Sequence, residues 1–222
     1  MNKKPIILFG AGGHGRSVAD VVESEGKYRI VGWIDSKRKP GEYFSGYKVL
    51  GNEQSLPCII KKSRVSRFVI ALGDNYQRMK VTNRICSIIP RARFVTSIHH
   101  SAVISPSASI ASGVVVMPNA IIHAHSSIEE GCLINTGASI DHDGYMEAFS
   151  SLAPGAVLGG NVQIGTCSAV GLGASVIQKV RIGRHTVIGA GSVVVRDIPD
   201  EVVAFGNPCS VQRKRNIDEA YL

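Results

Sequence analysis

The sequence predicts two domains of different fold class: an α/β domain with a small parallel sheet over residues 1–97, and an all-β domain built as a parallel β-helix over residues 98–222. Two observations support this prediction. Short apolar segments alternate with amphipathic segments in the first half, whereas every sixth residue is apolar in the second. A chain of 222 residues is also long enough for two small domains, each with its own core.

The elements expected in the first domain follow one another as strand, helix, strand, strand and helix. Apolar runs at 5–9, 28–34 and 67–72 are typical of buried strands, and the stretches 16–25 and 77–88 have helical periodicity. Strands that alternate with helices form a parallel sheet, because each crossover returns the chain to the same end of the sheet. The first domain is therefore expected to be a small parallel α/β fold.

The second domain is expected from a six-residue repeat whose phase never slips. A helix has no period of six, and antiparallel strands would give alternation with irregular turn spacing. A three-sided coil explains the pattern, because each short strand buries one large side chain and a small residue four positions later lets the chain turn the corner. The large positions are Ile104, Ile110, Val116, Ile122, Ile128, Ile134, Ile140, Met146, Leu152, Leu158, Ile164, Val170, Val176, Ile182, Ile188 and Val194.

Composition narrows the class of protein further. Hydrophobic residues make up 44% of the chain and charged residues 19%, which excludes disorder as the main state. The five cysteines never have C-x-x-C spacing and the chain starts without a secretory apolar segment, so we expect a cytoplasmic protein. No apolar stretch approaches the roughly 20 residues that span a bilayer. The net charge of +8 indicates an anionic partner, but no aromatic residues are interleaved for base stacking, so nucleic acid is not expected.

A glycine-rich loop follows the first expected strand and precedes the first expected helix. Gly10-x-Gly12-x-x-Gly15, with Asp35 at the end of the second strand, matches the dinucleotide-binding fingerprint. This pattern alone favours NAD, but the segment before the repeat is too short for a second mononucleotide-binding half. Bare glycine amides at a helix N-terminus bind any pyrophosphate, including that of a nucleotide sugar. A tight structural turn is the simpler alternative.

One histidine in the repeat is placed for acid–base chemistry. His142 lies between Asp141 and Asp143, two residues after the inward Ile140, and so on a corner of the coil. A histidine with a pKa near neutrality can accept a proton from an amine, and a flanking carboxylate raises its basicity. One coil earlier, His125 is expected beside Asp143, where it either tunes this carboxylate or is a simple surface residue. A polar turn histidine is the alternative for His142, and no metal-ligand spacing is present.

Several sequence motifs in both halves occur in the same order as in one known family. They are FGAGGHG at 9–15, ID at 34–35, ALGDN at 71–75, HSAVISP at 100–106, INT at 134–136, IDHD at 140–143 and GNP at 206–208. With these motifs the chain resembles the sialic-acid and bacillosamine branch of the sugar O- and N-acyltransferases, over nearly its whole length. That group contains bacterial UDP-amino-sugar and GDP-perosamine N-acetyltransferases.

The resemblance implies a Rossmann-like first domain, a left-handed hexapeptide-repeat β-helix and a homotrimer with active sites between neighbouring copies. It also implies acetyl-CoA as co-substrate, no metal, and a catalytic pair formed by the base His142 and Asp143. Independently of the resemblance, Gly160 lies one coil after His142 and offers a bare amide for an oxyanion. From the resemblance we expect acetyl-CoA at Ser151, Leu172 and Ala190, with Gly160 added to this set, and the nucleotide sugar at Gly12, Gly13, His14, Asp35, Ser36, Gly73 and Arg78, with Asn135 added.

The resulting functional hypothesis is transfer of acetyl from acetyl-CoA to the amino group of a nucleotide-linked sugar, a UDP-4-amino-4,6-dideoxy sugar, in bacterial surface glycan synthesis. Sialic-acid-type O-acetylation and GDP-perosamine N-acetylation are alternatives with the same fold. A non-catalytic nucleotide-sugar-binding assembly protein and an NAD-dependent oxidoreductase are alternatives of other classes. The sequence leaves open the nucleotide base, the position and stereochemistry of the amine, N- versus O-acylation, the acyl chain length and the glycan pathway.

Overall fold

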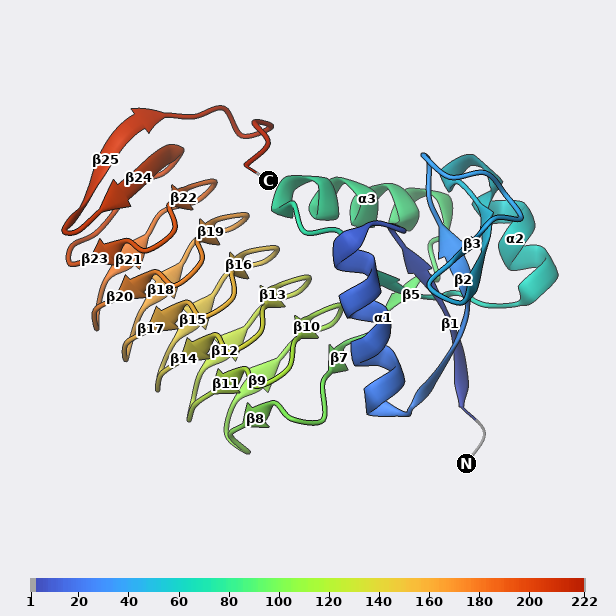
Figure 1. Ribbon diagram of the computed structural model, residues 1–222, viewed down its shortest axis with the longest axis horizontal. Helices are drawn as coiled ribbons and strands as arrows, with labels where there is room; N and C mark the ends of the chain where they lie inside the picture. Colours follow the sequence, from blue (N-terminus) through green and yellow to red (C-terminus); the bar gives the residue numbers. More distant parts are fainter. Residues whose placement is uncertain (1–2, 222) are drawn as a thin grey trace.

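The computed structural model describes residues 3–221 and consists of an α/β unit joined to a three-sided parallel β-helix (Figure 1). The α/β unit contains one six-stranded sheet with the order β3-β4-β2-β1-β5-β6, in which only the β3–β4 pair is antiparallel. Its elements are β1 (Lys4–Phe9), α1 (Gly13–Glu25), β2 (Tyr28–Ile34), β3 (Tyr43–Phe44), β4 (Tyr47–Gly51), the 3₁₀ helix η1 (Glu53–Ser55), α2 (Leu56–Ser63), β5 (Arg67–Ile70), α3 (Asn75–Ile88) and β6 (Arg93–Phe94).

The strands and helices predicted for the first half are confirmed within a few residues at their ends. The hairpin of β3 and β4 and the helix α2 were not predicted. The hairpin is anchored by Trp33, which is fully buried and donates an indole hydrogen bond to the carbonyl of Phe44 at 2.9 Å. α2 has a short amphipathic pattern between Ser55, its N-cap, and Arg64, its left-handed C-cap. Eight residues are too few for periodicity to identify a helix.

The β-helix is built from two-residue strands that stack in three sheets. From β7 to β20, each strand pairs in parallel with the strand 18 residues later in the chain, as in Ile122 with Ile140. The strands are β7 (Ser97–Ile98), β8 (Val103–Ile104), β9 (Ser109–Ile110), β10 (Val115–Val116), β11 (Ile121–Ile122), β12 (Ser127–Ile128), β13 (Leu133–Ile134), β14 (Ser139–Ile140), β15 (Tyr145–Met146), β16 (Ser151–Leu152), β17 (Val157–Leu158), β18 (Gln163–Ile164), β19 (Ala169–Val170), β20 (Ser175–Val176), β21 (Arg181–Ile182), β22 (Val187–Ile188) and β23 (Val193–Val194).

The six-residue prediction is confirmed by the core of this β-helix. Its large repeat positions from Val116 to Val194 are buried, and the small residues four positions later, such as Ala138 and Ala174, are buried beside them. One apolar side chain per strand therefore fills the axis, while the side chains at the corners stay free for other roles.

The two units share a core. The outward side chains Val115 and Leu133 of one β-helix sheet, together with Met117, belong to the same apolar cluster as Val18 and Val22 of α1. This sheet, which contains β7, β10, β13, β16, β19 and β22, is covered by the α/β unit over its first coils. A contiguous core of this kind fixes the position of the cavities that both units line.

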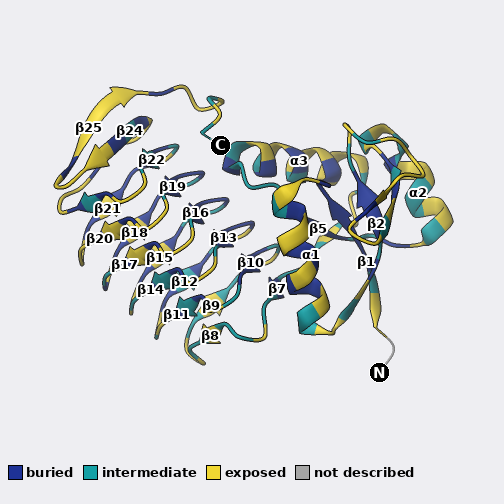
Figure 2. Cartoon of the chain, viewed as in Figure 1, coloured by how far each residue is buried: buried dark blue, intermediate teal, exposed yellow. Residues whose placement is uncertain are grey.

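A C-terminal hairpin closes the open end of the β-helix. β24 (Val202–Gly206) pairs in parallel with β22 and antiparallel with β25 (Cys209–Lys214), which is exposed almost along its whole length (Figure 2). Solenoids need such caps because the last coil otherwise presents an unpaired edge. The tail then returns to the α/β unit, where the Tyr221 hydroxyl accepts a hydrogen bond from the amide of Asn75 at 3.0 Å. No helix within the described residues has the length and apolarity to cross a membrane.

Candidate active site

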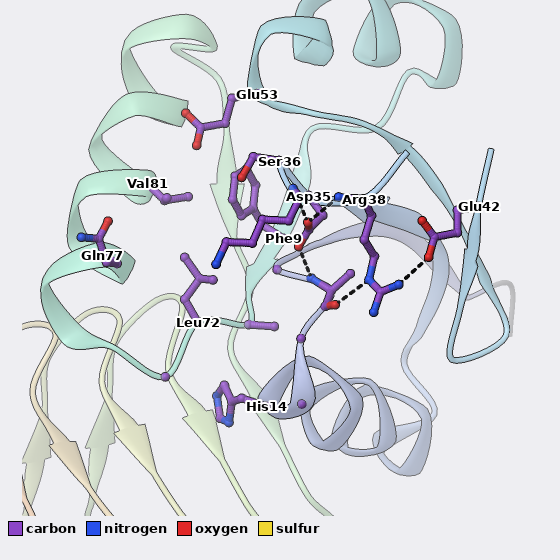
Figure 3. A pocket seen from close by; sticks show the side chains of 17 residues that line it. Phe9, His14, Asp35, Ser36, Arg38, Glu42, Glu53, Leu72, Gln77 and Val81 are labelled. Carbon is purple, nitrogen blue, oxygen red and sulfur yellow. Dashed lines mark hydrogen bonds and ion pairs between the residues drawn. The ribbon is translucent and has the colours of Figure 1, made fainter. Parts of the chain in front are cut away.

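A cavity of about 780 Å³ lies at the carboxyl ends of β1, β2 and β5 (Figure 3). It is lined by the glycine loop and the first turn of α1. The N-cap of α1 is Gly12, which has no side chain to accept the first amides of the helix. Unpaired amides at a helix N-terminus attract phosphate oxygens, so this end of the cavity suits a pyrophosphate.

The glycines of this loop have two separate functions. A Cβ atom added to Gly12 or Gly13 would meet no heavy atom within 4 Å, so the backbone there is open to an approaching ligand. A Cβ on Gly15 would lie 2.3 Å from the carbonyl oxygen of Gly10, and Gly10 itself has a φ of +102°. Gly10 and Gly15 are therefore required for the turn and for the close approach of α1 to β1.

Asp35 connects the glycine loop to the end of β2. Its carboxylate accepts hydrogen bonds from the amides of Ala11 at 2.8 Å, Lys37 at 2.7 Å and Arg38 at 3.1 Å. The Arg38 guanidinium in turn donates to the carbonyl of Ala11 and forms an ion pair with Glu42. Asp35 and Ser36 both line the cavity, so the acid predicted from the fingerprint also fixes the shape of the loop.

A second cavity, of about 420 Å³, lies across successive coils of the β-helix. It is lined by small or apolar residues of the sheet that the α/β unit covers and of the corner that follows it, including Ser151, Leu172 and Ala190, together with Asn135 and the Tyr221 ring. The predicted coenzyme residue Gly160 is not among its lining residues. A mainly apolar cavity that extends across successive coils suits an extended pantetheine arm.

The two cavities meet at His14 and Gly73, which line both of them. Burial, with a smaller contribution from the nearby Arg78 guanidinium, lowers the pKa of His14 to about 4. The imidazole is therefore neutral near pH 7 and can both donate and accept a hydrogen bond at the junction.

His142 lies on an exposed corner between β14 and β15. Its Nδ1 is 2.7 Å from Oδ2 of Asp143, and its backbone amide donates to Oδ1 of Asp141 at 2.7 Å. The hydrogen bond to Asp143 raises the pKa of His142, with a smaller contribution from the charge of Asp141. The imidazole is 57% exposed, and its second nitrogen, Nε2, is the one left to meet a ligand.

Gly160 provides the space that the imidazole occupies. A Cβ on Gly160 would lie 2.6 Å from Nε2 of His142, so any larger residue would displace the ring. The amide of Gly159 donates to the Val176 carbonyl at 2.9 Å and is engaged in the coil. His125 occupies the corner one coil before Asp143, as expected from the register, but Asp143 has its close contact with His142.

The prediction that Arg78 contacts substrate is not supported by the geometry. Arg78 is 97% buried, lines neither cavity, and directs its guanidinium at main-chain carbonyls of both units. Its hydrogen bonds go to the carbonyls of Gly131, Leu72, Gly73, Phe149 and Ser150 and to the side chain of Asn75. With its donors already engaged, Arg78 fastens α3 to the β-helix instead of binding a ligand.

Several cavity residues were not predicted from the sequence. Lys37, Arg38, Glu53 and Gln77 line the first cavity, and Tyr221 closes the second. Lys37 and Arg38 could have been predicted as cavity residues, because they follow the second strand directly, at the edge of the sheet where the glycine loop lies. Tyr221 had no such signal. Its position depends on the C-terminal tail, which contacts Asn75, a residue 146 positions earlier in the sequence.

A Rossmann-like unit fused to a hexapeptide β-helix, with a histidine–carboxylate pair on a coil corner, defines the class of nucleotide-sugar acyltransferases. Residues 5–85 match the family described as PglD N-terminal domain. A curated relative, UDP-N-acetylbacillosamine N-acetyltransferase of Bacillus subtilis (strain 168), is 35% identical over 120 residues. That match covers 51% of this chain and spans about half, 51%, of the relative.

Solved structures are similar over nearly the whole chain. A histidine-to-alanine mutant of GDP-perosamine N-acetyl transferase from Caulobacter crescentus, in complex with CoA and GDP-perosamine, is 36% identical with a TM-score of 0.89 and covers 95% of this chain and 97% of its own. The acetyltransferase domain of PglB from Neisseria gonorrhoeae FA1090, in complex with acetyl coenzyme A, is 35% identical with a TM-score of 0.87 and covers 95% and 100%. The chain belongs to this PglD-like family of sugar N-acetyltransferases.

Proposed function

We propose that this protein transfers the acetyl group of acetyl-CoA to the amino group of a nucleoside-diphosphate-linked sugar. The observation that carries the proposal is the hydrogen-bonded pair of His142 and Asp143, with Nδ1 and Oδ2 at 2.7 Å, on an exposed corner beside the bare backbone of Gly160. This pair has the chemistry of a general base whose second nitrogen accepts a proton.

The nucleotide sugar is proposed to bind in the first cavity, within residues 1–97. Its pyrophosphate would meet the amides of Gly12, Gly13 and His14, and its nucleoside would lie toward Asp35 and Ser36. Gly73 lines both cavities, so the sugar would leave the first cavity beside it and extend toward Asn135 in the second. The neutral His14 offers the sugar or phosphate a hydrogen bond without adding charge.

Acetyl-CoA is proposed to bind along the second cavity, mainly against the β-helix of residues 98–222. Ser151, Leu172 and Ala190 lie on successive coils there and would line the pantetheine arm. The amide of Gly160, beside the imidazole of His142, is the group we assign to the thioester oxygen, because Gly159 already donates to Val176. Acetyl-CoA supplies the activated acetyl group.

The base works through the tautomer that Asp143 holds. With Nδ1 donating to Asp143, Nε2 of His142 is free to accept a proton from the attacking amine as the nitrogen–carbon bond forms. The carbon–sulfur bond breaks, and the departing thiolate takes a proton back from the imidazolium. No side chain needs to carry the acyl group. Cys132 and Cys167 do not suit that role, because burial raises the pKa of each thiol to about 11 and keeps it protonated near pH 7.

We further propose a homotrimer in which the base of one copy serves the cavities of its neighbour. His142 lines neither cavity of its own chain, and the strands β8, β11, β14 and β17 separate its corner from the second cavity. The outward residues of these strands are apolar except for Ser139, and the outward valines Val103 and Val157 are 62% and 45% exposed. A second copy packed on this face would bury it and bring His142 of one copy to the second cavity of its neighbour. The five free cysteines favour the cytoplasm as the compartment.

The test is release of free CoA from acetyl-CoA in the presence of UDP-, GDP- or CMP-linked sugars that carry either an amine or a hydroxyl at the acceptor carbon. The proposal predicts release with an amino sugar and none with its hydroxy counterpart. UDP and GDP compounds come first, since the relatives act on UDP- and GDP-linked sugars by name. Release with the hydroxy sugar alone would establish the O-acetylation alternative, and thermal stabilisation by nucleotide sugar without any CoA release would establish the non-catalytic binding class.

A further inference from the structure

The charge of the chain is distributed unevenly. Between Gln54 and Ile128 the only acidic side chain is Asp74, although this stretch contains many lysines and arginines. Two of these do not contribute a free surface charge, because Arg78 is buried and the exposed Arg84 is paired with Glu53. Apart from Lys80 on α3, the remaining cations of this stretch belong to one limited surface of the α/β unit.

That surface is the edge of the sheet where the parallel strands begin. Arg67 and Arg93 start the neighbouring strands β5 and β6 and face each other in register. The carboxyl ends of α2 and α3 return to the same edge. We call this surface the basic edge and define it by Lys61, Lys62, Arg64, Arg67, Arg91 and Arg93.

The cations of the basic edge have no counter-charge in the fold. None of the six forms an ion pair with an acidic residue in the part of the chain that the structure describes. Five are exposed and Arg67 is half-buried. Lys4 and Arg29, at the starts of β1 and β2, extend the same edge. Cations near helix carboxyl ends offset the helix dipoles, but that effect acts within the last turn and does not explain cations on four strand starts.

An apolar groove opens in the middle of the basic edge. It has a volume of about 470 Å³ and is lined by Pro57, Ile60, Ile88, Ile89 and Pro90, with Arg91 at its rim. Ile88 is 37% exposed at the end of α3. Apolar side chains next to unpaired cations match the two layers of a membrane surface, anionic headgroups outside and acyl chains beneath.

The position of the basic edge leaves the catalytic cavities accessible. The first cavity opens at the carboxyl ends of β1, β2 and β5, which is the opposite edge of the same sheet. Figure 1 shows α2 on the side of the α/β unit that faces away from the β-helix. A surface docked at the basic edge would therefore not cover the entrance for nucleotide sugar or the corner of His142.

We propose that the basic edge docks this protein on bilayers rich in anionic phospholipid, with Ile88 and the groove around it contacting the acyl region. Each basic residue close to such a surface strengthens binding by roughly fivefold, so six unpaired cations on one edge are enough for reversible association. Nucleic acid is the weaker occupant, because the groove contains no aromatic ring on which a base would stack.

The test is flotation of the full chain with phosphatidylcholine vesicles that contain or lack phosphatidylglycerol. Wild-type protein should float only with the anionic vesicles and should be released by high salt. Combined replacement Lys61→Gln, Lys62→Gln, Arg91→Gln and Arg93→Gln should weaken binding by nearly three orders of magnitude, at roughly fivefold for each charge removed. Ile88→Ser should weaken it by a few-fold and leave the salt dependence unchanged.

Matched controls carry the same changes elsewhere. Lys179→Gln, Arg181→Gln, Arg196→Gln and Lys214→Gln remove equal charge from exposed positions of the β-helix and hairpin, and Val211→Ser removes an exposed apolar side chain from β25. These variants should bind vesicles within about twofold of wild type. Thermal midpoints confirm that every variant is folded.

Three results would each overturn the proposal: no flotation of wild-type protein, equal loss in the β-helix control, or full binding by the basic-edge variant. Binding to single-stranded polynucleotide that depends on the basic edge, without vesicle binding, would assign the surface to nucleic acid instead.

Discussion

The α/β unit and the β-helix build their parts of the site by opposite means. The α/β unit forms its cavity from the main chain, with bare amides at Gly12 and Gly13 and a loop held by the carboxylate of Asp35. The β-helix presents side chains on corners whose backbone is repeated from coil to coil, as with His142. Substitutions at the glycines that form the turn, Gly10 and Gly15, should therefore damage the fold, whereas substitutions at the corner should damage function alone.

The largest effect is expected at the corner. His142→Ala should lower kcat by roughly two to four orders of magnitude, because it removes the group that accepts the amine proton. The thermal midpoint should barely change, since the imidazole is 57% exposed. Steady-state kinetics and thermal unfolding measure the two quantities. His125→Asn, on the equivalent corner one coil earlier, is the control and should keep both; equal loss of rate in this variant would mean that the corner itself, not the base, is what matters.

The glycine loop should behave in the opposite way. Gly15→Ala places a Cβ 2.3 Å from the Gly10 carbonyl oxygen and should destabilise the protein by roughly 2–4 kcal/mol. Gly12→Ala points a methyl group into open space, so it should fold normally and raise KM for the nucleotide sugar by roughly tenfold. Denaturant unfolding separates the two variants. If Gly15→Ala is as stable as wild type, the close contact between α1 and β1 is not required.

Replacing Asp143, the hydrogen-bond partner of His142, should change the pH dependence of the rate by an intermediate amount. Asp143 raises the pKa of His142, and the reaction needs the unprotonated imidazole, so wild-type activity should fall as pH decreases through a pKa above the ordinary value. Asp143→Asn removes the carboxylate, and the acid limb of the rate profile should move to lower pH while the plateau rate falls by roughly tenfold. An acid limb in the same place would remove Asp143 from the mechanism.

The smallest effect is expected in the second cavity. Leu172→Ala removes apolar contact from a side chain that is already 60% exposed, so KM for acetyl-CoA should rise by only a few-fold with kcat unchanged. Val211→Ala, an exposed apolar position on the hairpin, is the matched control. A change in KM for the nucleotide sugar instead would place the coenzyme elsewhere.

The repeat could be predicted because one feature recurs at every coil. The phase from Ile104 to Val194 fixes which side chains are inward, and that phase also places His142 on a corner. The burial of Arg78 could not be predicted, because its partners are main-chain carbonyls such as that of Gly131, 53 residues away, and a sequence does not show where main-chain carbonyls lie. The closing hairpin β24–β25 and the contact of Tyr221 were missed for a similar reason, since they depend on tertiary packing after the repeat ends.

The shared site between copies is the central claim, and complementation tests it most directly. His142→Ala removes the base and leaves the second cavity intact, whereas Ala190→Phe fills the second cavity and leaves the base intact. Each variant alone should be inactive. Mixed oligomers purified through two different tags should regain a sizeable fraction of wild-type activity. At one interface, the intact imidazole of the Ala190→Phe copy then meets the intact second cavity of the His142→Ala copy. Mixed oligomers as inactive as their parents would mean that each chain builds its site alone, which would contradict a site shared between copies.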